Sequence, residues 1–169
     1  TLQHAGVITG LGGYAGHSHK YKQKGGSGYL FRTATVQDFS AVTGACLLVR
    51  ASVYDEVGGL DEQFAVAFND VDFCLRVRDA GYRIAWTPYA QLVHYESKSR
   101  GGDEKDPAKA ARFAAEQQRL YAIHGKEDIL DDPYYNPNLT RDREDFSESD
   151  DLRRLKEGTV TVRFRVGEA

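Results

Sequence analysis

The sequence contains few residues of the kinds that define special protein classes. Its 169 residues include no methionine, two cysteines and one tryptophan. Two cysteines cannot build a disulfide framework, so we expect Cys46 and Cys74 to be buried thiols in a reducing compartment. This favours the cytoplasm, including the inner face of the membrane. Apolar runs are shorter than a membrane span, so no membrane crossing is predicted. Because no methionine begins the chain, we interpret it as a piece of a longer protein.

The chain also lacks an excess of positive charge. Its net charge is -3 and its pI is about 5.9. Binding to a phosphate backbone needs a basic face, so nucleic acid is excluded as the main partner. A composition of 41% hydrophobic and 28% charged residues is typical of one globular domain.

The densest pattern of motifs lies between residues 42 and 101. Hydrophobic patterning there predicts a buried strand at Ala45–Val49, a helix at Ala51–Val57, a helix from Asn69 to Gly81, and strands at Arg83–Trp86 and Gln91–Tyr95. Outside this stretch we expect a strand at Leu2–Thr9 and a helix at Pro107–His124.

Asp70 stands at the junction of a loop and the predicted helix. A carboxylate in that position can face a cleft and serve as a general base. Alternatively, these residues only cap the helix: Asn69 is a good capping residue, and Asp70 and Asp72 place negative charge near the positive end of the helix dipole. Spacing alone favours the capping interpretation, because caps are far commoner than bases.

Several short motifs occur together in a fixed order. They are T-G-A at 43–45, G-G-L-D-E at 58–62, N-D-V-D-F-C-L-R at 69–76, A-G-Y-R at 80–83, T-P at 87–88 and H-Y-E-S at 94–97. In order and spacing this series resembles the C-terminal half of inverting family-2 glycosyltransferases of the GT-A fold.

The resemblance implies an α/β fold, a partial GT-A fold with a mixed sheet flanked by helices and the donor-binding half missing. Residues 1–139 would form the acceptor-side part, and residues 140–169 a charged, solvated arm with a terminal strand at Thr159–Val166. The implied function is transfer of a sugar from a nucleotide-sugar donor to a glycan or other hydroxyl acceptor with inversion, as in cell-surface polysaccharide synthesis. The alternative is a noncatalytic carbohydrate-binding or assembly module on the same scaffold.

The resemblance also implies roles for individual residues. Asp70 matches the family's base, while Asn69 stands where the family usually has Glu and is expected to contact the substrate. His94 matches the histidine that joins an upstream D-x-D in holding a divalent metal, Mg²⁺ or Mn²⁺, a cofactor expected only in the full-length protein. Thr43-Gly44-Ala45 matches an acceptor contact.

Two further residues are candidates for substrate binding. Trp86 ends a predicted strand and can stack on a sugar ring, although aromatic residues of this kind, including Tyr89 and Tyr95, more often pack in a core. Arg100 belongs to a basic, glycine-flanked turn that can fold over a diphosphate; a solvated turn is the alternative.

The segment from Gly10 to Gly28 is rich in glycine and histidine. Gly10, Gly12 and Ala15 satisfy the spacing G-x-G-x-x-A, but no helical pattern follows, so we reject a dinucleotide site. A zinc site at His4, His17 and His19 lacks a fourth ligand nearby, and a mobile, solvated loop is favoured. Unpaired strand edges in a partial fold predict a homodimer of the fragment.

Overall fold

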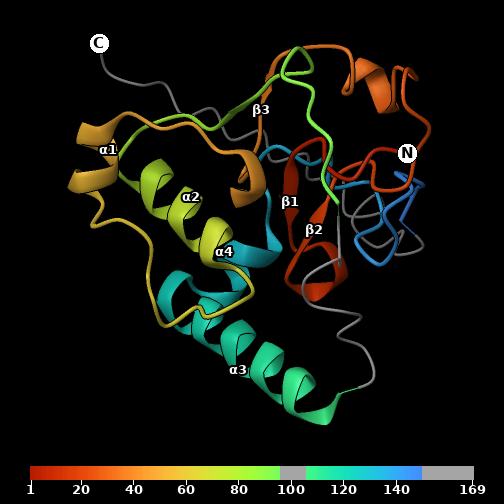
Figure 1. The fold of residues 1–169 in the computed structure, drawn as a ribbon. Coiled ribbons are helices and arrows are strands. Elements are labelled where there is room, and N and C mark those ends of the chain that lie inside the picture. Colours follow the sequence, from red (N-terminus) through yellow and green to blue (C-terminus); the bar gives the residue numbers. More distant parts are fainter. Residues whose placement is uncertain (96–105, 150–169) are drawn as a thin grey trace.

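The computed structural model describes residues 1–95 and 106–149 (Figure 1). The elements, in chain order, are β1 (Val7–Thr9), the 3₁₀ helix η1 (Leu11–Gly13), β2 (Ala15–His17), η2 (Tyr29–Phe31), β3 (Gln37–Asp38), η3 (Gly44–Cys46), α1 (Ala51–Glu56), α2 (Asn69–Asp79), β4 (Ala85–Trp86), α3 (Pro107–His124) and α4 (Lys126–Leu130). The mixed α/β class is as predicted.

The sheets are smaller than predicted. β1 pairs with β2, and β3 pairs with β4, each antiparallel and two-stranded. The predicted mixed sheet is therefore absent from the described residues. Arg83, which precedes β4, donates to the carboxylate of Asp38 in β3 at 2.9 and 3.1 Å and so links the two strands of the second sheet.

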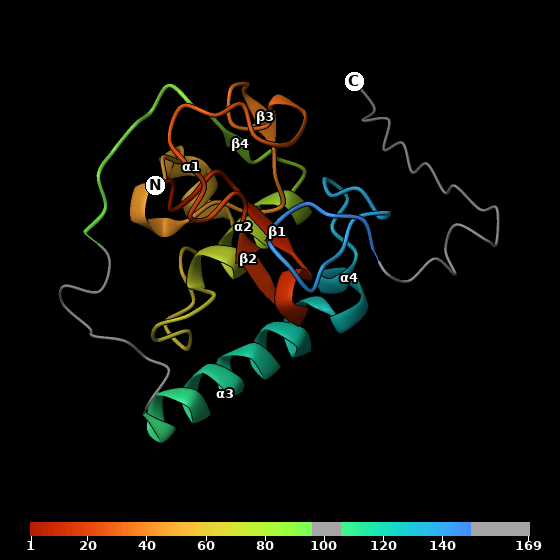
Figure 2. The same cartoon turned by 90° about the vertical axis from the view of Figure 1, so that its right-hand side faces the viewer.

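The three predicted helices are confirmed as α1, α2 and α3. The local sequence signals are clearest for α3. α3 begins after Asp106, whose side chain accepts the Ala108 N–H, has Pro107 in its first turn and ends at Gly125 with φ of 80°. Figures 1 and 2 show α3 along one side of the molecule, with α2, α4 and the β1–β2 hairpin next to it.

Four predicted strands are wrong in whole or in part. Arg83–Trp86 is a strand only at Ala85–Trp86. Leu2–Thr9 is a strand only from Val7 onward. Ala45–Val49 begins in η3 and is not a strand, with Leu48 98% exposed, and Cys46 is exposed rather than buried. Gln91–Tyr95 has no strand pairing, and the predicted core residues Tyr89 and Tyr95 are exposed. Leu2 instead exchanges backbone hydrogen bonds with Tyr21 and Lys22, and no strand pairs with residues 45–49 or 91–95 among the described residues.

Two clusters of buried side chains form the core. The larger one joins α2, α3 and the β1 edge and includes Phe73, the fully buried Cys74 and Leu120. Burial raises the pKa of the Cys74 thiol to about 11, as expected for an inert thiol. The smaller cluster contains Ile8, Leu11, Phe39, Tyr135, Leu139 and Phe146.

The second cluster corrects the prediction of a solvated arm after residue 139. Phe146 is only 9% exposed, and Leu139 forms an antiparallel bridge with Glu148. The first part of that arm is therefore packed against the body of the protein. The predicted terminal strand at Thr159–Val166 lies outside the described residues.

The glycine-rich segment is also more ordered than predicted. Gly10, Gly12 and Gly13 have positive φ values and turn the chain between β1 and β2. No helix opens after Ala15, which agrees with the rejection of a dinucleotide site. Among the helices of residues 1–95 and 106–149, none has the length and apolar character needed to cross a membrane.

Candidate active site around Asp70

The predicted base and the predicted acceptor-binding turn lie in direct contact. The Gly44 N–H donates to Oδ2 of Asp70 at 2.8 Å. Thr43 starts η3 and its Oγ1 accepts the Ala45 N–H at 3.3 Å, which fixes the turn. A Cβ at Gly44 would lie 3.4 Å from Asp70 Cβ, in van der Waals contact with it. The structure thus brings together four of the residues predicted from the sequence.

Asp70 itself lies in the first turn of α2 and is half-buried. Its Oδ1 accepts the Val71 N–H at 2.9 Å. One backbone N–H on each oxygen fixes the orientation of the carboxylate and leaves lone pairs for a further hydrogen bond. Asn69 does not cap the helix: its Oδ1 accepts the Asp70 N–H at 2.8 Å, and Phe68 occupies the capping position.

The loop before α2 is held in place by α3. Phe68 has a left-handed backbone with φ of 63°, a strained conformation for a bulky residue. Its buried ring packs against Tyr14 and Phe113. The carboxylate of Glu116 in α3 accepts the Ala67 N–H at 2.6 Å and the Val66 N–H at 3.3 Å. Glu116 therefore fixes the backbone that leads into Asp70.

Asp72 anchors α2 to α3. Its side chain is 1% exposed and accepts from Arg76 at 2.7 and 3.0 Å and pairs with Nε2 of His124 at 2.8 Å. Burial raises the pKa of Asp72, but hydrogen bonds from His124 and Arg76 outweigh burial, so its pKa lies below the usual range. Asp72 is a structural residue beside the candidate base.

His94, the predicted metal ligand, contacts Gln3. Nδ1 of His94 lies 2.6 Å from Oε1 of Gln3. An amide oxygen only accepts hydrogen bonds, so Nδ1 carries the proton and Nε2 keeps its lone pair. This is the arrangement of a metal-binding histidine whose other nitrogen is oriented by a neighbour. Among the described residues, no group of three or more His, Cys, Asp or Glu side chains is placed to hold a metal ion.

His4, which precedes the glycine-rich segment, and His17 and His19 within it are packed, so the prediction of a solvated loop is wrong for these histidines. Nε2 of His4 accepts the N–H groups of Gly6 and Thr43 at 3.2 and 3.4 Å, and its Nδ1 lies 3.2 Å from Nδ1 of His17. Burial, and then His17, lowers the pKa of His4 to about 3. A neutral His4 thereby links the N-terminal segment to the Thr43 turn.

Trp86, another predicted site residue, is not brought to Asp70. Trp86 ends β4 and is partly buried, with its ring edge-on to Phe39 at 6.4 Å. This contact joins Trp86 to the core and leaves its contact with substrate a prediction. Arg100 lies outside the described residues.

Comparison with known proteins decides the family. The model of "Glycosyl transferase family group 2" matches residues 3–121, more than half of the chain. The chain belongs to this glycosyltransferase family. No solved structure matches the chain.

Curated relatives of this glycosyltransferase chain are much longer than the chain. It is 49% identical to an uncharacterized protein of Sinorhizobium fredii over 86% of the chain and 16% of the relative. It is 36% identical to the O-antigen biosynthesis protein RfbC of Myxococcus xanthus over 83% of the chain and 11% of the relative. Over 47% of the chain and 24% of the relative it is 36% identical to an N-acetylglucosaminyl-diphospho-decaprenol L-rhamnosyltransferase of Mycobacterium tuberculosis.

Sequence reasoning missed three residues that organise the candidate site around Asp70. Gln3, Glu116 and His124 each act through a contact with a residue far away in the chain. Their sequence neighbourhoods carry no signal for such contacts, because helical spacing reports only which face of α3 is apolar. Glu116 and His124 lie eight positions apart, close to the two-turn spacing that places side chains on one face, and this was the one usable hint.

Proposed function

We propose that the chain is the acceptor-side part of an inverting glycosyltransferase of the GT-A fold, which transfers a sugar from a nucleotide-sugar donor to a hydroxyl group of a glycan. The observation that carries the proposal is the contact between Asp70 and Gly44, which places a fixed, half-buried carboxylate beside the predicted acceptor turn. The names of two relatives, O-antigen biosynthesis protein and rhamnosyltransferase, support a role in cell-surface polysaccharide synthesis.

In the proposed reaction the acceptor hydroxyl donates a hydrogen bond to a free lone pair of Asp70. The hydroxyl oxygen forms a bond to the anomeric carbon of the donor while the bond from that carbon to the diphosphate breaks. The hydroxyl proton passes to Asp70 as the new bond forms. Attack on the face opposite the leaving diphosphate inverts the anomeric configuration. The Gly44 and Val71 N–H groups hold the carboxylate in line throughout.

A transfer assay tests this function. The chain together with the donor-binding sequence that would precede it is incubated with radiolabelled nucleotide sugars and lipid-linked oligosaccharides, and release of nucleoside diphosphate is measured. We expect release of nucleoside diphosphate that depends on the oligosaccharide acceptor and occurs with one of the nucleotide sugars. Carbohydrate binding without any transfer would identify the noncatalytic module instead.

We also propose that His94 supplies one ligand to a divalent metal ion, Mg²⁺ or Mn²⁺, with the remaining ligands outside the described residues. Such a metal ion would neutralise charge on the leaving diphosphate. The free Nε2 of His94 suits this role. We expect His94→Ala to weaken metal-dependent nucleotide binding about tenfold, in line with the loss of one ligand. Calorimetric titration of Mn²⁺ in the presence of nucleotide measures this, and an unchanged titration would make His94 structural.

The isolated chain is expected to form a homodimer and to lack transfer activity. Tyr89, Leu92 and Val93 expose 81, 70 and 77% of their surface within residues 89–93, where the structure has no strand. Exposed apolar chain of this kind seeks a partner. Light scattering over a concentration series should show dimers, and Leu92→Lys with Val93→Lys should shift them to monomers. A monomer at all concentrations would contradict the prediction.

A further inference from the structure

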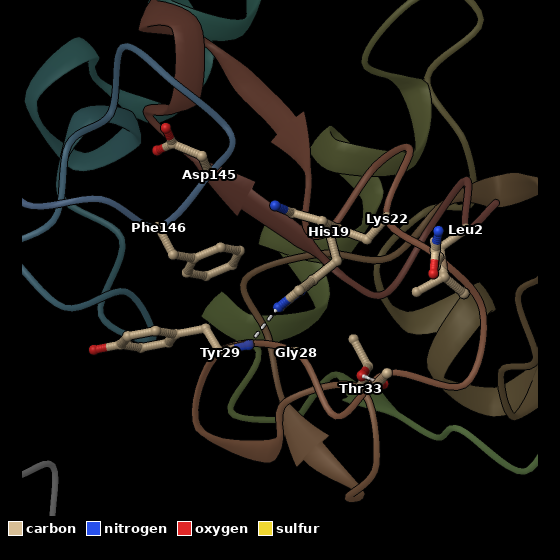
Figure 3. Close-up of a pocket in the computed structure, with 10 residues that line it drawn as sticks. Leu2, His19, Lys22, Gly28, Tyr29, Thr33, Asp145 and Phe146 are labelled. Carbon is tan, nitrogen blue, oxygen red and sulfur yellow. Dashed lines mark hydrogen bonds between the residues drawn. The ribbon is translucent and has the colours of Figure 1, made fainter.

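Two cavities meet at a pair of aromatic side chains away from Asp70. The first has a volume of about 480 Å³ and is lined by residues that include Leu2, His19, Lys22 and Thr33 (Figure 3). The second has a volume of about 360 Å³ and is lined by residues that include Arg32, Tyr134 and Asn136. Tyr29 and Phe146 line both. Both volumes fall within the range of about 300–1,000 Å³ in which proteins bind small ligands.

The shared wall is a stack of rings. Tyr29 and Phe146 lie parallel, with centroids 5.2 Å apart and an interplanar angle of 15°. Phe146 also stacks on His19 at 4.3 Å. Figure 3 shows these three side chains together on one side of the first cavity, with Leu2 on the other. Because Tyr29 is half-buried, part of its ring remains open to a ligand.

The stack is fixed by hydrogen bonds. Nε2 of His19 accepts the Tyr29 N–H at 3.0 Å, and Nδ1 of His19 pairs with the Ser18 hydroxyl at 2.7 Å. A Cβ at Gly28 would lie 2.6 Å from Nε2 of His19, so only glycine fits at position 28 beside the His19 ring. The platform is therefore formed before any ligand arrives, which lowers the entropic cost of binding.

The charges around the first cavity favour a neutral ligand. The lining of this cavity contains one cation, Lys22, and one anion, Asp145, whose pKa is lowered by hydrogen bonds from Ser147. Burial, and then Arg32 and Lys22, lowers the pKa of His19 to about 4, so its ring is uncharged at neutral pH. A nucleotide diphosphate would require a surplus of positive charge here. A sugar requires ring faces for its C–H groups and polar groups for its hydroxyls, and this cavity supplies both.

The second cavity adds amide and phenol groups. Asn136 is exposed, and its side-chain Nδ2 lies 3.5 Å from the Tyr29 hydroxyl. Arg32 is held in the wall by its position over the Phe39 ring and by donation to the Tyr134 carbonyl at 3.2 Å. Its Nε and Nη2 atoms are buried without a hydrogen-bond partner among the described residues, and the Asp132 carboxylate offsets part of its charge.

We propose that the two cavities bind neighbouring sugar units of a carbohydrate chain, with the Tyr29–Phe146 stack as the platform between them. The proposal rests on the proposed function, in which the acceptor is a glycan, and extends it. Neither cavity is lined by Asp70 or by Thr43–Ala45, so this site holds the acceptor chain away from the reacting hydroxyl.

Glycan-array binding of the chain tests the proposal. The array carries bacterial cell-surface polysaccharides together with their mono-, di- and tetrasaccharide fragments. We expect binding that strengthens from the mono- to the disaccharide of one polysaccharide. Tyr29→Ala should weaken it at least about tenfold, since it removes the stacking face. Tyr21→Ala is the matched control, because Tyr21 belongs to the same segment, is 67% exposed and lines neither cavity.

Lys22→Ala is a second test variant, used in case Tyr29→Ala disturbs folding. Lys22 is exposed, so its replacement should leave the fold intact, and it lines only the first cavity. It should weaken binding of the disaccharide more than binding of the monosaccharide. Absence of binding to every glycan, or binding that neither Tyr29→Ala nor Lys22→Ala weakens, would overturn the proposal. The array measures binding alone, so glycan binding by a protein that fails the transfer assay separates failure of the transfer chemistry from failure of the glycan site.

Discussion

Replacing Asp70 by Asn is expected to lower the rate of sugar transfer by about 10²–10⁴-fold, the usual contribution of a general base. The amide keeps the shape of the carboxylate, and its oxygen can still accept the Gly44 N–H that Oδ2 accepts at 2.8 Å, while the amide nitrogen replaces the oxygen that accepts the Val71 N–H. The fold and donor binding should therefore persist. What is lost is the group that takes the proton from the acceptor hydroxyl.

The measurement is the single-turnover rate of transfer at saturating donor, with donor affinity determined separately. Asp79→Asn is the matched control, since Asp79 lies on the same helix, is exposed and lies at its other end. It should retain full activity. A loss below tenfold in Asp70→Asn, or an equal loss in both variants, would remove Asp70 from the role of base.

The helices could be predicted from the sequence because their signals are local. Asp106, Pro107 and Gly125 mark both ends of α3, and the structure has the helix between them. α4 was missed because five residues, Lys126–Leu130, carry too little periodicity to distinguish a helix from a turn.

Strands were predicted less well because a strand requires a partner. Ala45–Val49 is as apolar as a buried strand, yet Leu48 is almost fully exposed. Apolar character indicates that a segment prefers burial, but only the neighbouring chain decides whether pairing occurs. The same holds for Gln91–Tyr95, which has no strand pairing in the structure.

The candidate site was predicted in its local parts only. Asp70 and the Thr43–Ala45 turn were identified by resemblance, and the structure places them in contact. Glu116, which fixes the loop before Asp70, lies in a segment that reads as an ordinary helix. Contacts of this kind depend on how α3 packs against α2, which no local pattern encodes.

Asp72→Ala is expected to lower the free energy of unfolding by about 3–5 kcal/mol, the usual cost of removing one partner from a buried ion pair. Asp72 joins Arg76 on its own helix to His124 at the end of α3. Without the Asp72 carboxylate, Arg76 and His124 lose the buried acceptor of their hydrogen bonds. Stabilities of single domains are about 5–15 kcal/mol, so this one side chain would account for a large share.

Urea unfolding followed by the fluorescence of the single tryptophan, Trp86, and by circular dichroism measures the change. Asp79→Ala, an exposed carboxylate on the same helix, should alter stability by no more than about 0.5 kcal/mol. If Asp72→Ala does not fold, Asp72→Asn supplies the comparison. A loss below about 1 kcal/mol in a folded variant would show that the ion pairs do not contribute to stability.

The same residue predicts how stability changes with pH. The pKa of Asp72 is lower in the folded protein than its ordinary value of 3.8. Its contribution is therefore complete above the pKa of the unfolded state and is lost as pH falls through the lower pKa of the folded state. We expect the stability of the wild type to decrease below about pH 5, and that of Asp72→Ala to decrease less steeply. Other carboxylates, including Asp61 and Asp145, also have lowered pKa values and are present in both proteins. The difference between the two pH profiles therefore isolates Asp72, and parallel profiles would show that its carboxylate is not stabilised by folding.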